Sequence, residues 1–233
     1  MKYALLVFLL SLSLPSAAQQ ADSATYLAPV TKELTTVWPK NRTINLVFHG
    51  HSVPAGFWHD HEVHTLESYP NLVLAALKKQ YPYAVINVIV TAIGGENAIK
   101  GQTRLEQDVL IHKPDVLFID YALNDRFSEL GKVKDAWSKM IRSALDRNVP
   151  VILLTPSPDQ RLNILDAANP LEPHVRQIHQ LAEQYHIGLA DPYTKFKEVA
   201  SRGKLTEYMS HVNHPNKAGH EIIANELVKW FRK

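Results

Sequence analysis

The sequence predicts an α/β fold, in which helices cover both faces of a parallel β-sheet. Short apolar segments rich in Val, Ile and Leu alternate along the chain with longer segments of helical periodicity. Near-continuous apolar segments are typical of strands buried on both faces, and sheets buried in this way are parallel. The chain has 233 residues, of which 45% are hydrophobic, so it can bury one such core and we expect one folded domain.

Five segments have the composition of buried strands. They are residues 44–48, 84–90, 115–121, 150–154 and 187–190. Helical periodicity fills the intervals, most clearly over 130–144, 175–185 and 223–231, and more weakly over 68–81 and 97–112. This alternation predicts a three-layer α/β/α sandwich, and five strands favour the flavodoxin-like strand order 2-1-3-4-5.

The first 18 residues have the features of a secretory signal peptide. Met1-Lys2 gives a positive start, an uncharged apolar run extends from Ala4 to Leu14, and residues 15–18 are small or proline. The run is too short to span a bilayer, so we expect cleavage near Ala18, export to the periplasm or beyond, and no stable membrane anchor. A buried N-terminal helix is the alternative. A weakly patterned lead-in then occupies residues 19–42, and the folded domain occupies 43–233.

Charge and cysteine content exclude further classes. The formal net charge is only +2 and no long block of one sign occurs, so we expect no nucleic-acid partner. The chain contains no cysteine, which excludes disulfides and a lipoprotein anchor at the end of the apolar run.

The predicted strand order gathers polar residues at one place. In the order 2-1-3-4-5, strand 1 lies between strands 2 and 3, and ligands bind beyond the carboxyl ends of the strands at such a switch point. The segments that follow these three strands contain Ser52, Gly95 and Asn124. A serine hydroxyl on a tight turn after a strand is exposed, and Gly50 lacks the Cβ that would crowd the turn. A nucleophile and two hydrogen-bond donors are therefore expected side by side.

Four short motifs follow one another along the chain. They are Gly50-His51-Ser52, Gly95 within Ala92-Ile93-Gly94-Gly95-Glu96, Asn124 within Leu123-Asn124-Asp125, and His214 within Asn213-His214-Pro215-Asn216. Each motif is degenerate alone. In this order, each after a strand or before the last helix, they resemble the four blocks of the SGNH/GDSL-like serine hydrolase (esterase/lipase) superfamily, from about Ile44 to the C-terminus.

The resemblance implies a role for each of these residues and no cofactor. Ser52 Oγ attacks an ester carbonyl, His214 takes its proton, and water hydrolyses the resulting acyl-enzyme. The oxyanion is stabilised by the backbone N–H of Ser52, the N–H of Gly95 and the side-chain amide of Asn124. Without the resemblance, Gly95 would be read as a turn residue and Asn124 as a helix cap.

Two positions depart from the family pattern. The aspartate beside the nucleophile is replaced by His51, and the aspartate three residues before the histidine is replaced by His211. An imidazole cannot replace the carboxylate that orients the catalytic histidine, and loss of that carboxylate lowers kcat about 10⁴-fold in serine proteases. We expect either a Ser-His dyad oriented by a backbone carbonyl, or a carboxylate from elsewhere, with Glu207 and Asp125 as candidates. A weak or inactive relative is the third alternative.

Two further segments bear on the expected site, one that leads the chain to His214 and one that follows Ser52. Residues 192–210 provide the length that His214 needs to reach strand 1 from the sheet edge. After Ser52, the cluster of His59, His61 and His64 could bind a metal ion, although its spacing matches no structural zinc pattern and we predict no metal site. Phe57 and Trp58 could form a wall for an acyl chain or a platform for a sugar.

The sequence therefore predicts an exported serine esterase that removes an acyl group, such as O-acetyl, from a carbohydrate or another small ester. A lipase or thioesterase of the same superfamily is one alternative. A non-catalytic periplasmic binding protein with a metal-binding histidine loop is the other. Oligomeric state cannot be deduced from these patterns.

Overall fold

A computed structural model describes residues 19–232, and the predicted signal peptide lies outside them. The strands are β1 (Thr43–Gly50), β2 (Val85–Val90), β3 (Val116–Asp120), β4 (Val151–Leu154) and β5 (Gly188–Ala190). They form one sheet in the order β2-β1-β3-β4-β5, and every pair of neighbours is parallel. The predicted fold class and strand order are confirmed.

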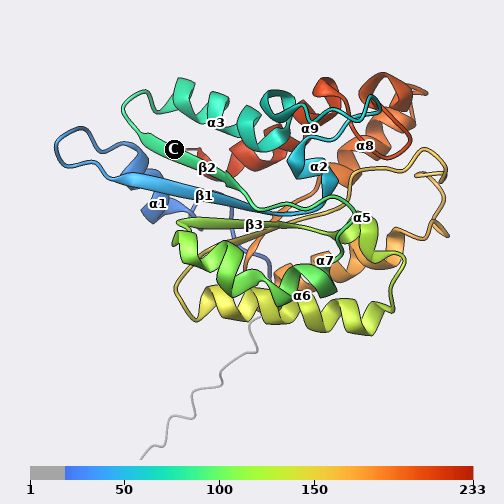
Figure 1. The fold of residues 1–233 in the computed structure, drawn as a ribbon, viewed down its shortest axis with the longest axis horizontal. Coiled ribbons are helices and arrows are strands. Elements are labelled where there is room, and N and C mark those ends of the chain that lie inside the picture. The colour runs from blue at the N-terminus through green and yellow to red at the C-terminus, as the bar shows by residue number, and fades with distance from the viewer. Residues whose placement is uncertain (1–18, 233) are drawn as a thin grey trace, which may run out of the picture.

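Helices cover both faces of the sheet, as Figure 1 shows. The α-helices are α1 (Ala28–Leu34), α2 (Ser52–Ala55), α3 (Tyr69–Gln80), α4 (Ala98–Thr103), α5 (Ala122–Asp125), α6 (Leu130–Leu145), α7 (Glu172–Tyr185), α8 (Pro192–Ala200) and α9 (Lys217–Val228). Helices α3, α8 and α9 lie on one face, and α4, α6 and α7 lie on the other. None of the helices in residues 19–232 is long and apolar enough to cross a bilayer.

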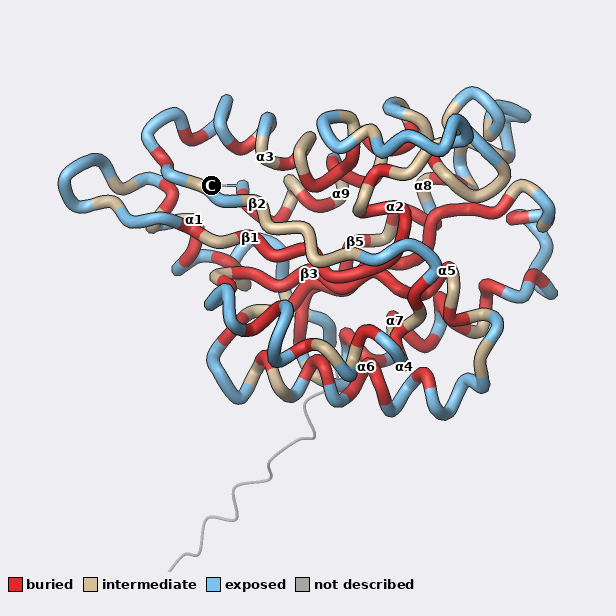
Figure 2. Tube along the Cα trace, viewed as in Figure 1, coloured by how far each residue is buried: buried red, intermediate tan, exposed pale blue. Residues whose placement is uncertain are grey.

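Alternate residues of each strand supply the two apolar cores between these layers. Phe48 and Phe118 pack in the core beneath α3 and α9, with their rings stacked 4.3 Å apart. Their neighbours Val47 and Leu117 point into the opposite core, beneath α6. Both faces of the central strands are thus buried, and Figure 2 shows a continuous buried band through the sheet. This burial explains why these strands have near-continuous apolar sequences.

The sequence patterns differ from the structure in two places. Residues 192–210, expected to provide a connecting loop, contain helix α8, which begins at Pro192 after Asp191 accepts a hydrogen bond from the N–H of Thr194 at 3.1 Å. An aspartate cap followed by proline favours a helix start. The weak helix expected over 97–112 is divided into α4, a π-turn at Leu105–Val109 and a 3₁₀ turn at Leu110–His112.

The lead-in before the first strand is tied to the rest of the protein. Leu27 and Leu34, at the two ends of α1, are buried in the same core as Phe48. The hydroxyl of Tyr26 donates to the carbonyl of Val151 at 3.2 Å and accepts from its N–H at 2.9 Å. Residues 19–42 therefore pack as part of the domain that the sheet organises.

Candidate active site

The turn between β1 and α2 presents Ser52. Gly50, the last residue of β1, pairs with Asp120 of β3, and α2 begins at Ser52. A Cβ on Gly50 would lie 2.5 Å from the carbonyl oxygen of Asp120 and 2.8 Å from Pro54 Cγ, distances that no side chain tolerates. The absence of a side chain at position 50 is therefore required for the close approach of β3 to this turn.

The imidazole of His214 reaches Ser52 from the far end of the chain. His214 Nε2 lies 2.9 Å from Ser52 Oγ, within hydrogen-bond distance. Burial, with smaller contributions from nearby His51 and His211, lowers the pKa of His214 from 6.5 to about 4. The ring is therefore neutral at neutral pH, and Nε2 can accept the hydroxyl hydrogen.

The other ring nitrogen of His214 has no carboxylate. Nδ1 is buried and has no hydrogen-bond partner among residues 19–232, so neither candidate acid reaches it. Asp125 is committed elsewhere, because its two oxygens accept from Ala98 N–H at 2.8 Å and from Trp137 Nε1 at 2.7 Å. His211, at the position where the family has aspartate, stacks on His214 with ring centroids 6.4 Å apart.

Main-chain hydrogen bonds fix the loop that carries His214. The carbonyl oxygen of His214 accepts from Ser210 N–H at 2.9 Å and from His211 N–H at 3.2 Å. From a neighbouring loop, Gln160 donates its backbone N–H to Val212 O at 2.7 Å and its side-chain amide to His211 O at 3.1 Å. These contacts hold the backbone of the loop, while the ring of His214 has, within residues 19–232, a hydrogen-bond contact at Nε2 and none at Nδ1.

The two other candidate donors come from the segments after β2 and β3. Gly95 has φ +77°, a conformation that favours glycine, in a loop tied to β1 by the Ile93 N–H, which donates to Gly50 O at 3.0 Å. Asn124 lies in α5, and its Nδ2 donates to Glu96 O at 2.8 Å. An amide group has two hydrogens, so the second hydrogen of Asn124 Nδ2 remains able to bond a substrate oxygen.

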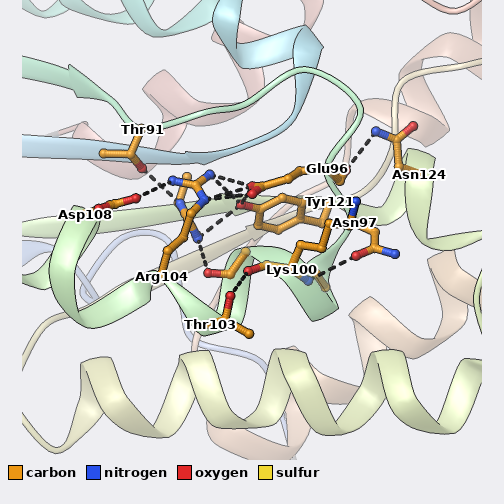
Figure 3. Close-up of polar contacts among 12 residues, drawn as sticks. Thr91, Glu96, Asn97, Lys100, Thr103, Arg104, Asp108, Tyr121 and Asn124 are labelled. Atoms are coloured by element: carbon orange, nitrogen blue, oxygen red, sulfur yellow. Dashed lines mark hydrogen bonds and ion pairs between the residues drawn. The ribbon is translucent and has the colours of Figure 1, made fainter.

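A buried polar network supports the Gly95 loop, and the sequence patterns did not predict it (Figure 3). The Glu96 carboxylate pairs with Arg104, whose Nη2 lies 2.6 Å from Oε2, and it accepts from the Tyr121 hydroxyl at 3.0 Å. That hydroxyl also contacts His49 Nε2 at 3.1 Å. These four residues come from four separate segments, so no local spacing could have identified them.

The histidine-rich loop after Ser52 does not assemble as its sequence suggested. Ligand atoms of Asp60, Glu62 and His64 lie within 4.8 Å of one another, whereas His59 and His61 are not part of that group. His64 Nε2 already contacts Asp60 Oδ2 at 2.9 Å. The indole of Trp58 stacks on His64, with centroids 3.9 Å apart and planes 12° apart, which gives this loop a flat aromatic pair near the nucleophile turn.

Comparisons with known proteins identify the family of this chain. A sequence model of the GDSL-like Lipase/Acylhydrolase family matches residues 48–222. An acetylxylan esterase from Geobacillus stearothermophilus is 26% identical over 181 residues, which are 70% of this chain and 83% of that protein.

Solved structures share the fold. A two-domain esterase (CEX) active on acetylated mannans superposes with a TM-score of 0.73 at 21% identity, over 92% of this chain. This chain spans about half of that protein, 54% of its length. The acetylxylan esterase Axe2 from Geobacillus stearothermophilus superposes with a TM-score of 0.70 at 22% identity, over 82% of this chain and 94% of its own.

Proposed function

The chain belongs to the GDSL-like lipase/acylhydrolase family and is a hydrolase of ester bonds; from this premise we propose that it removes acetyl groups from carbohydrate through a Ser52–His214 dyad. The contact that carries the proposal is the 2.9 Å distance between His214 Nε2 and Ser52 Oγ, made by residues 162 positions apart. A general base must lie within about 2.6–3.2 Å of the group it deprotonates, and this contact does.

The reaction proceeds in two steps of the same form. Ser52 Oγ bonds to the acetyl carbonyl carbon while His214 Nε2 takes the hydroxyl proton, and that proton then passes to the departing sugar oxygen. In the second step, His214 takes a proton from water, the hydroxide attacks the acetyl-serine, and acetate leaves as Ser52 recovers its hydrogen. Both steps require a neutral imidazole, which the low pKa of His214 supplies at neutral pH.

We assign three hydrogen-bond donors to the oxygen that becomes negative. The N–H groups of Ser52 and Gly95 and the free hydrogen of Asn124 Nδ2 would bond this oxyanion. Each such donor is worth about 3–4 kcal/mol of barrier, because it acts on charge that exists only in the transition state. The Asn124–Glu96 hydrogen bond at 2.8 Å supports this assignment, since it fixes the amide before substrate arrives.

We attribute the orientation of His214 to its loop rather than to an acid. Hydrogen bonds from Ser210 and His211 hold its carbonyl, and Gln160 holds the residues before it. The imidazolium formed during catalysis then has no carboxylate neighbour among residues 19–232, which agrees with a low pKa for this ring. The dyad therefore depends more on preorganised donors at the oxyanion than a triad does.

The carbohydrate part of the proposal is supported by the relatives, which act on acetylated xylan and acetylated mannan. Export remains part of the same proposal, because residues 1–18 have the composition of a signal peptide. N-terminal sequencing of protein recovered from the culture supernatant or periplasm should begin near Gln19.

The test compares wild type with Ser52→Ala on p-nitrophenyl acetate and on acetylated xylo- and manno-oligosaccharides, with released acetate measured. We expect turnover on all three and a loss of about 10⁴-fold or more in Ser52→Ala, as for other serine nucleophiles. A fluorophosphonate probe should label wild type only. Absence of both turnover and labelling in folded wild type would overturn the esterase; turnover of the nitrophenyl ester alone would overturn only the carbohydrate substrate.

A further inference from the structure

His51 is the residue at the nucleophile turn that departs from the family pattern, and its surroundings show what it does there. The first block of the family is usually Gly-Asp-Ser, and an aspartate before a helix caps it by accepting a backbone N–H. His51 occupies that capping position for α2, and its Nδ1 accepts from the N–H of Val53 at 3.3 Å. The imidazole therefore makes the capping contact that a carboxylate would make.

This contact selects one form of the ring. A ring nitrogen that accepts a hydrogen bond carries no hydrogen, so the hydrogen of the neutral imidazole must be on Nε2. His51 Nε2 faces Asp120 Oδ1 across 3.4 Å, and both side chains are buried, with 0% and 5% of their surface exposed. The imidazole and the carboxylate on the neighbouring strand are therefore in ion-pair contact, although neither His51 Nε2 nor Asp120 Oδ1 has a hydrogen-bond partner among residues 19–232.

Asp120 has few other partners. Its second oxygen accepts from the Tyr69 hydroxyl at 3.1 Å, and no lysine or arginine of residues 19–232 pairs with it. Burial and the nearby Asp120 raise the pKa of Tyr69 well above 10, so Tyr69 remains a donor. Its backbone N–H in turn donates to His220 Nδ1 at 3.2 Å, which connects the cluster to α9, the helix that follows His214.

We propose that His51 and Asp120 form a positioning pair for Ser52, in which the carboxylate of the Gly-Asp-Ser block has been moved from the turn to the end of β3 and an imidazole caps the turn in its place. The proposal rests on the esterase function above, because positioning is measured through the reaction of Ser52. It follows that a carboxylate is tolerated at position 51 only when the side chain at position 120 is neutral.

The test is a charge exchange in the full chain. His51→Asp restores the usual residue of the family, yet it places a second buried carboxylate against Asp120, and like charges in a dry site repel strongly. We expect kcat on p-nitrophenyl acetate to fall by about 30-fold or more with KM nearly unchanged, since coupled residues differ from additivity by up to roughly 100-fold. Asp120→Asn alone should cost a few-fold.

The double variant His51→Asp with Asp120→Asn decides the matter. The new carboxylate caps α2 and accepts from the asparagine amide, so we expect kcat to return to within about 5-fold of wild type, well above the product of the single effects. His51→Asn should retain most activity because its amide can cap the turn and donate to Asp120, whereas His51→Ala should not.

Three readouts keep the outcomes separate. The rate at which a fluorophosphonate labels Ser52 should fall in His51→Asp and recover in the double variant, together with kcat. A loss of stability alone would not slow labelling under conditions where all of the protein is folded. If His51→Asp fails to fold, the unfolding transition must return in the double variant. If the double variant instead shows the product of the two single losses in kcat, and its folding does not recover, the proposed His51–Asp120 pair is overturned. An inactive but folded wild type overturns the esterase proposal instead.

Discussion

The two sides of the candidate active site are stabilised in different ways. On the nucleophile side, buried side chains bond one another around Ser52, Gly95 and Asn124, as in the Glu96–Arg104 pair at 2.6 Å. On the base side, the His214 loop is held through its main chain, and Nδ1 of the ring has no partner among the described residues.

This difference shows where transition-state stabilisation must come from. In a triad, a carboxylate stabilises the imidazolium, so the base contributes strongly. Here burial, with His51 and His211 nearby, lowers the pKa of His214 to about 4. Stabilisation of the transition state then depends mainly on the hydrogen-bond donors assigned to the oxyanion. Variants on the nucleophile side should therefore cost more than variants that act on the orientation of the base.

Among the variants that compare the two sides, the largest effect is expected for Asn124→Ala, which removes a donor from the oxyanion and the hydrogen bond to Glu96. We expect kcat to fall about 10²–10³-fold with a small change in KM, because the donor bonds charge formed only in the transition state. Steady-state kinetics on p-nitrophenyl acetate measure this. Asn87→Ala, at an exposed position in β2, is the matched control and should behave as wild type. A loss of less than about 5-fold would remove Asn124 from the oxyanion site.

The second variant is Glu96→Gln, which keeps the shape of the side chain and removes the charge that pairs with Arg104. Arg104 is only 14% exposed in its side chain, so loss of its partner leaves a partly buried cation and loosens the Gly95 loop. We expect kcat to fall about 10–100-fold with KM within about 2-fold, since a preorganised donor is disturbed rather than removed.

Glu106→Gln is the control for that variant. Glu106 pairs with Arg147 at 2.7 Å, but both side chains are about half exposed, at 56% and 48%. Exposed ion pairs contribute little, so kcat should be unchanged and the unfolding temperature nearly so. Equal effects of the two glutamine variants would show that the buried network has no special connection to catalysis.

The smallest effect is expected on the base side, from His211→Asp. A carboxylate at this position can accept from His214 Nδ1 and should raise the pKa of His214 by about one unit or more. Because His214 must be neutral to act, activity is lost as pH falls through its pKa, so the acid limb of kcat/KM should move to higher pH. His211→Asn, which has the same shape without the charge, should not produce that shift. An unmoved limb in the aspartate variant would mean that position 211 cannot reach the ring.

The sequence predicted the sheet and its strand order because both depend on patterns that are local or topological, and the grouping of Ser52, Gly95 and Asn124 stays a prediction from that strand order. Apolar runs identify buried strands, and parallel strands end at the same edge. The supporting network could not be predicted, since Glu96 and Tyr121 meet only after the chain has folded. The grouping of Asp60 with His64 likewise depends on how the loop doubles back through the Phe57–Val63 bridge.

The sequence showed that position 211 is histidine, but it left open whether Glu207 or Asp125 supplies a carboxylate to His214 instead. Only the structure shows that Asp125 is fully bonded to Ala98 and Trp137, and that burial raises the pKa of Asp125 to about 6. The role of His51, the residue before the nucleophile, could not be predicted from the sequence either, because Asp120, which it contacts, lies on another strand.

In the proposed mechanism, His214 acts as a base without an acid. Its ionisation can be followed directly by NMR, through the ring signals of isotopically labelled wild type between pH 3 and 8, with His214→Asn used to assign the signals. The structure predicts titration at about 4, far below the ordinary 6.5. Titration of His214 well above 6.5 would contradict the dyad, because a negative group close to the ring is what raises a histidine pKa above its ordinary value.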